Sequence, residues 1–307
     1  VRDGARRRHH CDDKDSVHPV GARTAGAHLR EAGLPQVSWI NNTNDDIAAA
    51  VGGNPAALER ILGAAQDPVY NLALRFLWHP QDAQDATQEI LIRIMTNLSA
   101  FRGESQFGTW VYRIAVNHLL RAKKSRAERR EISLKGTAAE MAKLDDDPLA
   151  DSEADRIYDI KIACTNGILL ALTRNYRIAF VLGAVLGMKS EAAAEILDIS
   201  AASFRQRLAR ARQMMSEFLN RQCGLMNADA ACRCAKRVRP ALQHGLAEPY
   251  IILSQRMKRS GEFGEIERTL GSQISTLERT ALLYRMNAEY RAPEVIHRRI
   301  RELLAGT

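Results

Sequence analysis

Apolar residues recur at helical intervals along nearly all of this 307-residue chain. The clearest example is the segment DAQDATQEILIRIMTNL, residues 82–98, in which one stripe of a helix would contain Ala83, Thr87, Ile90, Ile94 and Leu98. We find no convincing two-residue alternation of apolar and polar side chains, and no hairpin turn between β-branched runs. The sequence therefore predicts an all-α fold.

Changes in composition divide the chain into five segments. Residues 1–45 lack periodicity and are predicted to be disordered, unless they are upstream sequence foreign to the protein; they contain no apolar run of a secretory signal. A helical block spans 46–125, and a second spans 157–222. Residues 126–156 are first basic and then acidic, which is typical of a flexible linker. We expect two small helical domains, this linker and a helical C-terminal extension, 223–307.

Charge and cysteine content narrow the functional classes. The net charge of +8 favours a polyanionic partner, although a solubilising surface explains it equally well. No run approaches the roughly 18–20 apolar residues of a membrane helix, so we expect no membrane insertion. Five cysteines, an odd number, suit a reducing cytoplasm better than a disulfide framework. We therefore expect a cytoplasmic protein.

The first block combines a charged helix face with an unusual aromatic loop. The loop FRGESQFGTW, residues 101–110, places two Phe and one Trp among small and polar residues. Phe101, Phe107 and Trp110 either anchor the loop against the core or stack on a flat partner such as a nucleic-acid base. The following helix ends in basic residues, which suits phosphate contacts but also stabilises any helix C-terminus.

The second block contains the pattern of a helix-turn-helix. Residues 172–215 read as a helix, an LG turn, a short helix, a DIS turn and a basic helix. Ser200 is a suitable N-cap for the last helix, and Asp198 tolerates the left-handed conformation that the turn needs. Side chains that suit major-groove recognition project from the last helix: Arg205, Gln206, Arg207, Arg210 and Arg212. A basic helix that packs on a protein partner is the alternative.

These segments resemble a known family. Residues 82–120, DAQDATQEILIRIMTNLSAFRGESQFGTWVYRIAVNHLL, are similar without gaps to region 2 of bacterial RNA polymerase sigma factors of the extracytoplasmic-function (ECF) branch. The second block resembles region 4 of the same branch. Three features depart from the family pattern: a run of alanines at 192–194, Asp198 in place of the usual turn Gly, and the absence of Pro from LTRN at 172–175.

The resemblance implies three sets of binding residues. The face expected to dock on the polymerase β′ coiled coil consists of Asp82, Asp85, Gln88, Glu89 and Arg93. The residues expected to bind the minus-ten element, with one flipped base, are Arg102, Gly103, Glu104, Ser105, Gln106, Trp110, Arg113, Asn117 and Arg121. Those expected at the minus-thirty-five element are Ser203, Arg205, Gln206, Arg207, Ala209 and Arg210.

The implied function is transcription initiation without enzymatic activity. Core RNA polymerase, through its β′ coiled coil and β flap, and promoter DNA are the expected partners, and an anti-sigma factor is a further one. The alternative is a stand-alone helix-turn-helix regulator that binds duplex DNA without polymerase. An enzyme is disfavoured because we find no nucleophile paired with a base, no phosphate loop and no H-E-x-x-H, and we expect no catalytic residues.

The extension adds cysteines that the family resemblance does not explain. Cys223, Cys232 and Cys234 follow the spacing C-x8-C-x-C, and His244 is the nearest candidate for the fourth ligand of a structural zinc site. Neighbouring cations such as Arg237 are expected to lower the thiol pKa values. A redox pair and thiols without special chemistry remain alternatives, and no cofactor is otherwise required. We expect the extension to regulate access to DNA or polymerase.

Overall fold

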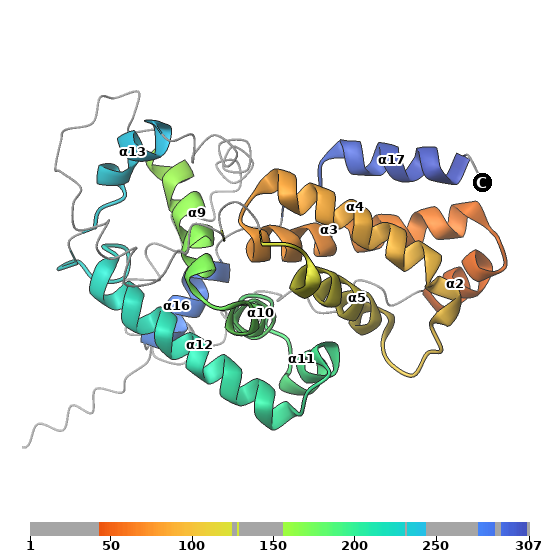
Figure 1. Ribbon diagram of the computed structural model, residues 1–307, viewed down its shortest axis with the longest axis horizontal. Coiled ribbons are helices and arrows are strands. Elements are labelled where there is room, and N and C mark those ends of the chain that lie inside the picture. Colours follow the sequence, from red (N-terminus) through yellow and green to blue (C-terminus); the bar gives the residue numbers. More distant parts are fainter. Residues whose placement is uncertain are drawn as a thin grey trace, which may run out of the picture. The chain divides into compact units, whose positions relative to one another are not determined.

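The regular elements of the computed structural model are helices wherever it describes the chain, which is at residues 43–124, 128, 156–230, 232–243, 276–285 and 290–305 (Figure 1). One isolated bridge joins Cys223 and Cys232. The predicted all-α fold is therefore confirmed. Most of the predicted disordered segment 1–45 and of the linker lies outside the described residues. No described helix is both long and apolar enough to cross a membrane.

The first block consists of α2 (Thr43–Val51), α3 (Pro55–Leu77), α4 (Pro80–Thr96), the 3-10 turn η2 (Leu98–Ala100) and α5 (Phe107–Arg121). Helix α2 thus begins just inside the segment predicted to be disordered. Asn54 caps α3, because its side chain accepts a hydrogen bond from the Ala57 backbone N–H at 3.1 Å. The apolar stripe predicted for 82–98 is buried, and α4 packs along α3. Burial of this stripe fixes which face of α4 remains outside.

The second block confirms the predicted helix-turn-helix. It consists of α9 (Ile157–Ile168), η3 (Leu169–Ala171), α10 (Arg174–Phe180), the π-helical turn η4 (Val181–Val185), α11 (Ser190–Leu197) and α12 (Ala201–Gln222). The Ser200 hydroxyl caps α12 by accepting from the Ser203 backbone N–H at 3.1 Å. Asp198 adopts the left-handed conformation, with φ 52° and ψ 50°. Both local turn predictions therefore hold.

Gly183 allows η4 to lie unusually close to α12. A Cβ atom added at this glycine would stand 2.5 Å from Leu208 Cδ2 and 3.0 Å from Phe204 Cζ. Real side chains do not approach that closely, so the absence of a side chain sets the separation of the two elements. Sequence periodicity does not reveal the π-helical turn, because the turn depends on this tertiary approach.

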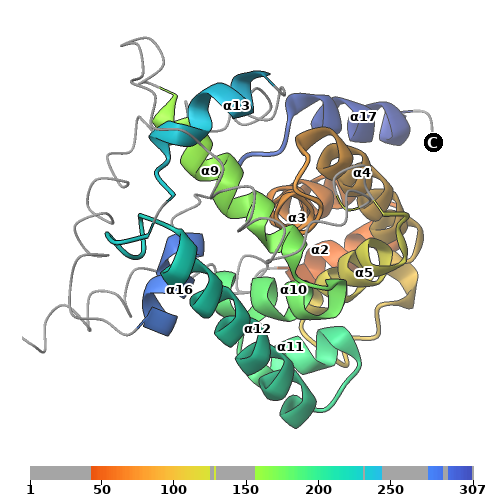
Figure 2. The same ribbon diagram turned by 60° about the vertical axis from the view of Figure 1, so that its left-hand side comes forward.

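The C-terminal extension packs on both blocks. Its described elements are η5 (Ala235–Arg237), α13 (Val238–Gln243), α16 (Thr276–Arg285) and α17 (Glu294–Ala305). Helix α16 lies against α12 and η4, and α17 lies along α3 (Figures 1 and 2). The Asn71 side chain donates to the Tyr290 carbonyl at 2.6 Å and accepts from the Tyr290 N–H at 2.9 Å. Tyr284 meets Phe180 edge to face, with ring centroids 5.1 Å apart.

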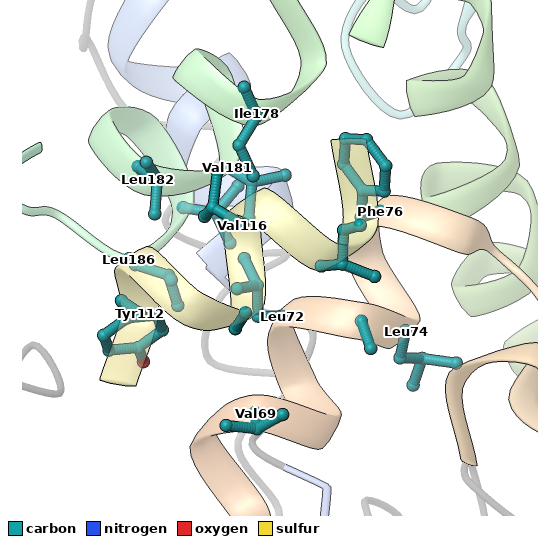
Figure 3. Close-up of a cluster of buried hydrophobic side chains, with 14 of the residues drawn as sticks. Val69, Leu72, Leu74, Phe76, Tyr112, Val116, Ile178, Val181, Leu182 and Leu186 are labelled. Carbon is teal, nitrogen blue, oxygen red and sulfur yellow. The ribbon is translucent and has the colours of Figure 1, made fainter. Parts of the chain in front are cut away.

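The two helical blocks share one hydrophobic core (Figure 3). Tyr112 and Val116 of α5 face Val181, Leu182 and Leu186 from the helix-turn-helix (Figure 3). Helix α5 also packs directly against α11. In this structure the blocks predicted as separate small domains are therefore packed against each other through α5.

A buried cluster of charges joins the ends of three helices. Glu128 accepts hydrogen bonds from Arg174 Nη2 at 2.7 Å and from Arg177 Nη1 at 2.8 Å. The side chains of Glu128 and Arg177 are 4% and 3% exposed. Glu128 belongs to the segment predicted to be a flexible linker, and two guanidinium groups hold its carboxylate in the interior.

The same guanidinium groups satisfy backbone carbonyls that helix ends leave without partners. Arg174 Nη1 donates to the Ala122 carbonyl at 2.6 Å, just after α5, and Arg177 Nη1 donates to the Phe76 carbonyl at 2.8 Å, near the end of α3. Burial lowers the pKa of Arg177, whereas its hydrogen bond to Glu128 acts in the opposite direction. We call Arg174, Arg177 and Glu128 the ion triad.

Replacing Glu128 with Ala should destabilise the protein, because the buried guanidinium group of Arg177 and the partly buried one of Arg174 would lose their shared carboxylate. We expect the apparent free energy of unfolding in urea to fall by about 3–5 kcal/mol. Asp46→Ala is the matched control, since it removes the carboxylate of the exposed Arg60–Asp46 pair and should change stability little. Equal small effects of the two substitutions would show that the ion triad does not support the fold.

Candidate nucleic-acid interface

An open groove of about 490 Å³ runs between α4, η2 and α5. Cationic, amide and aromatic side chains line it together: Arg93, Asn97, Trp110, Asn117, His118 and Arg121, with Ala100, Ile114 and Ala122 between them. Positive charge beside an aromatic ring is the combination that binds single-stranded nucleic acid, because bases stack on the ring and cations hold the phosphates. We call this feature the α4–α5 groove.

Three aromatic rings support one wall of the α4–α5 groove. The Phe101 and Phe107 rings meet edge to face at 5.1 Å, and the Phe107 and Trp110 rings stack at 5.4 Å. Phe107 is buried, whereas Phe101 and Trp110 are partly exposed. Phe107 therefore anchors the loop against the core, while Trp110 both packs on it and lines the groove. Phe107 thus fits the anchoring interpretation, whereas stacking of Trp110 on a flat partner stays a prediction.

The tip of the loop is a separate, exposed surface. Arg102, Gly103, Glu104 and Gln106 are exposed and Ser105 is partly buried, and none of the five lines the α4–α5 groove. Gly103 has φ 71°, a left-handed conformation that favours glycine. Of the residues predicted for the minus-ten element, Trp110, Asn117 and Arg121 thus share the groove, and five lie at the tip.

Arg113, the ninth predicted minus-ten residue, faces the helix-turn-helix instead. Its Nε donates to the Glu195 carbonyl at 3.2 Å, and its Nη2 donates to Glu195 Oε1 at 3.1 Å. Groove residues on α5 repeat at four- and three-residue steps through Trp110, Ile114 and Asn117. Each residue of an α-helix is rotated by about 100° from its neighbour, so Arg113 points to a different side of α5 from the groove residue Ile114. That side of α5 packs against α11.

The structure places one of the five residues predicted for the polymerase face, Arg93, with the groove residues. Asp85 and Glu89 are exposed on α4, and Asp82 and Gln88 are partly exposed, whereas Arg93 lines the α4–α5 groove. Asp85 accepts a hydrogen bond from Gln81 Nε2 at 3.0 Å, and Glu89 lies 3.8 Å from His118 Nε2. Burial lowers the pKa of His118, with Glu89 opposing that shift. Arg93 is thus grouped with the groove residues.

Helix α12 presents a basic outer face. Arg205, Gln206, Ala209 and Arg210 are exposed on it, and Arg207 is partly buried. The Ser203 side chain lies beside the cap, because its hydroxyl is 2.9 Å from Ser200 Oγ. The exposed Arg205 lies 3.8 Å from Glu191. One further arginine, Arg212, which the sequence predicts to project, is instead half-buried and donates to the Gly183 carbonyl at 3.3 Å.

The cysteines of the extension lie around a small cavity that also contains Cys164 of α9, which the sequence interpretation missed. Burial raises the pKa values of Cys223 and Cys232. Arg237, Arg233 and Lys236 act to lower the pKa of Cys232, as expected, but burial has the larger effect. Among the described residues, no group of three or more His, Cys, Asp or Glu side chains is already arranged to hold a metal ion. His244 lies outside the described residues.

Comparison with known proteins identifies both blocks. The family models that match are Sigma-70 region 2, at residues 62–129, and Sigma-70, region 4, at residues 166–215. A solved structure titled as CnrH in complex with the cytosolic domain of CnrY shares 24% identity, covers 60% of this chain and 98% of its own, and superposes with a TM-score of 0.39.

Two curated relatives match about half of this chain at comparable similarity. The RNA polymerase sigma-H factor of Pseudomonas aeruginosa is 30% identical over 172 residues, which are 54% of this chain and 88% of the relative. The ECF RNA polymerase sigma-E factor of Haemophilus influenzae is 30% identical over 173 residues, which are 53% of this chain and 87% of the relative. With both sigma regions present in order and most of each relative matched, the chain belongs to the ECF family of RNA polymerase sigma factors.

Proposed function

We propose that this sigma factor divides promoter opening among three surfaces: the outer face of α4 for polymerase, the α4–α5 groove for the melted minus-ten strand and α12 for the duplex minus-thirty-five element. The observation that supports this most strongly is the groove, because it gathers an aromatic ring, amides and cations between two helices. A regulator that binds only duplex DNA has no need for such a groove.

The acidic face of α4 suits a protein partner. Asp85 and Glu89 stand exposed beside the partly exposed Gln88, while the opposite side of the helix is buried against α3. The face is therefore held rigidly by the core and can dock without rearrangement of α4. We propose that it contacts the polymerase β′ coiled coil, and that the second block contacts the β flap. An anti-sigma factor stays a prediction.

The α4–α5 groove suits an unpaired DNA strand. Trp110 offers an apolar surface for stacking, which contributes about 1–3 kcal/mol per base in comparable sites. Arg93 and Arg121, which both line the groove, can neutralise phosphates on either side of that base. We therefore assign Arg93 to DNA rather than to polymerase. The polar tip around Ser105 and Gln106 would bind the edge of a flipped base.

The packing of α5 against α11 requires a change before the minus-ten helix can act fully. Arg113 is engaged with Glu195, and the side of α5 that carries Tyr112 and Val116 is buried against the helix-turn-helix. We propose that the contact between α5 and α11 opens when polymerase and promoter bind. We propose that the extension, whose α16 packs on α12 and whose α17 packs on α3, resists that opening.

Reconstituted transcription tests the proposal as a whole. The purified chain and core polymerase should together initiate run-off transcription from a promoter selected by binding from a random library, and neither should do so alone. Tight binding of that promoter by the chain without core polymerase, combined with no initiation when polymerase is added, would support the stand-alone regulator instead.

Substitutions on α4 should separate polymerase binding from DNA binding. The double change Asp85→Ala, Gln88→Ala should weaken affinity for core polymerase by about tenfold or more, since it truncates the centre of the docking face. Arg93→Ala should leave core affinity within about twofold, as a surface change outside the interface does. It should instead weaken binding of a single-stranded minus-ten oligonucleotide by the holoenzyme. If Arg93→Ala weakens affinity for core polymerase but not binding of the oligonucleotide, Arg93 belongs to the polymerase face instead.

Arginines on α12 should determine affinity for duplex DNA. Arg205→Ala and Arg210→Ala should each weaken binding of a minus-thirty-five duplex, by about 1–3 kcal/mol where a base edge is contacted. If the arginine contacts a phosphate instead, its loss should lower the slope of log affinity against log salt concentration by about one. Fluorescence anisotropy over a series of salt concentrations measures both. Arg221→Ala, at the exposed far end of α12, is the matched control, and an equal loss there would indicate only general charge attraction.

Removing the Glu195 carboxylate should favour the open arrangement. Both partners of the Arg113–Glu195 pair are partly exposed, at 39% and 43%, so Glu195→Ala should release at most about 1 kcal/mol. We expect up to about fivefold tighter binding of a single-stranded minus-ten oligonucleotide by the free protein. Glu59→Ala, an exposed change on α3, controls for lost negative charge. Weaker binding by Glu195→Ala would contradict the proposed opening.

A further inference from the structure

Four cysteines from three separate segments line one small cavity. Cys164 comes from α9, Cys223 follows the end of α12, and Cys232 and Cys234 lie in the segment before η5. They are four of the five cysteines in the chain. The cavity has a volume of about 20 Å³, enough for one water-sized particle and far too small for an organic ligand.

The backbone around Cys223 is shaped to bring the thiols together. Cys223 and Cys232 form a parallel bridge, and the Gly224 N–H donates to the Cys232 carbonyl at 3.0 Å. A Cβ atom at Gly224 would stand 2.6 Å from that carbonyl oxygen, so this approach requires glycine. The backbone N–H groups of Met226 and Asn227 both donate to the Cys223 carbonyl at 2.9 Å, which holds the chain in a tight turn directly after this cysteine.

Positive charge lies close to two of these thiols. Arg237 lines the cavity and acts to lower the pKa of both Cys164 and Cys232, and Arg233 and Lys236 act in the same direction on Cys232. A divalent ion with four thiolates carries a net charge of about −2, which neighbouring cations would offset. A disulfide would use only two of the four thiols and would need no compensating charge.

We propose that Cys164, Cys223, Cys232 and Cys234 bind one thiophilic metal ion, with zinc as the expected occupant. Four sulfur ligands in tetrahedral arrangement are typical of structural zinc. The described side chains are not yet arranged for coordination, so binding includes rotation of the thiols toward the cavity. Cys164, rather than His244, supplies the fourth ligand. The ion would connect the start of the C-terminal extension to α9 of the second block.

Metal analysis of the full-length protein tests this site. Protein purified from zinc-supplemented cells should contain about one zinc ion per chain. Cys164→Ser and Cys232→Ser should each weaken zinc affinity by at least about tenfold. The matched controls are Cys11→Ser, which removes the remaining cysteine, and His244→Ala, which removes the alternative ligand; both should retain zinc.

Cobalt substitution separates loss of a ligand from loss of folding. The wild-type protein with Co²⁺ should show the visible absorption of a tetrahedral thiolate site, and Cys164→His should keep cobalt with a shifted spectrum. Three results would overturn the proposal: no zinc in the wild-type protein, a folded Cys164→Ser with undiminished zinc affinity, or zinc that His244→Ala removes and Cys164→Ser keeps.

Discussion

The ion triad is the interaction on which the arrangement of this sigma factor depends. Glu128 holds Arg174 and Arg177 in the interior, and their remaining donors bind carbonyls at the ends of α5 and α3. Both guanidinium groups also lie over the Phe76 ring, at 5.7 and 5.1 Å from its centroid. A buried charge without its partner is strongly unfavourable, so these three side chains fix where the second block begins relative to the first.

That arrangement gives α5 two different faces. One side lines the α4–α5 groove with Trp110 and Asn117, and the other contributes Tyr112 and Val116 to the core shared with the helix-turn-helix. The helix proposed to bind melted promoter is therefore also the helix that holds the two sigma regions together. Binding of DNA and separation of the regions are linked in this account, because Arg113 is engaged with Glu195 in the packed arrangement.

Local structure was predictable from sequence where short-range physics determines it. The apolar stripe of α4, the Ser200 cap and the left-handed Asp198 each depend on residues within one or two helical turns. Contacts between distant segments were not predictable. Arg93 lies in the groove, Arg212 binds the Gly183 carbonyl and Cys164 joins the later cysteines only because separate helices pack together in the folded chain.

Helices α5 and α11 are packed together in this structure, and we propose that they separate when the protein acts. Spin labels introduced as noncanonical residues at Glu59 of α3, which packs with α5, and at Glu191 of α11 lie on exposed positions and leave the native cysteines and the groove residues intact. Pulsed electron paramagnetic resonance should show a single distance in the free protein and a clearly longer one in the complex with core polymerase and promoter DNA. An unchanged distance in that complex, in protein that supports transcription, would contradict the account.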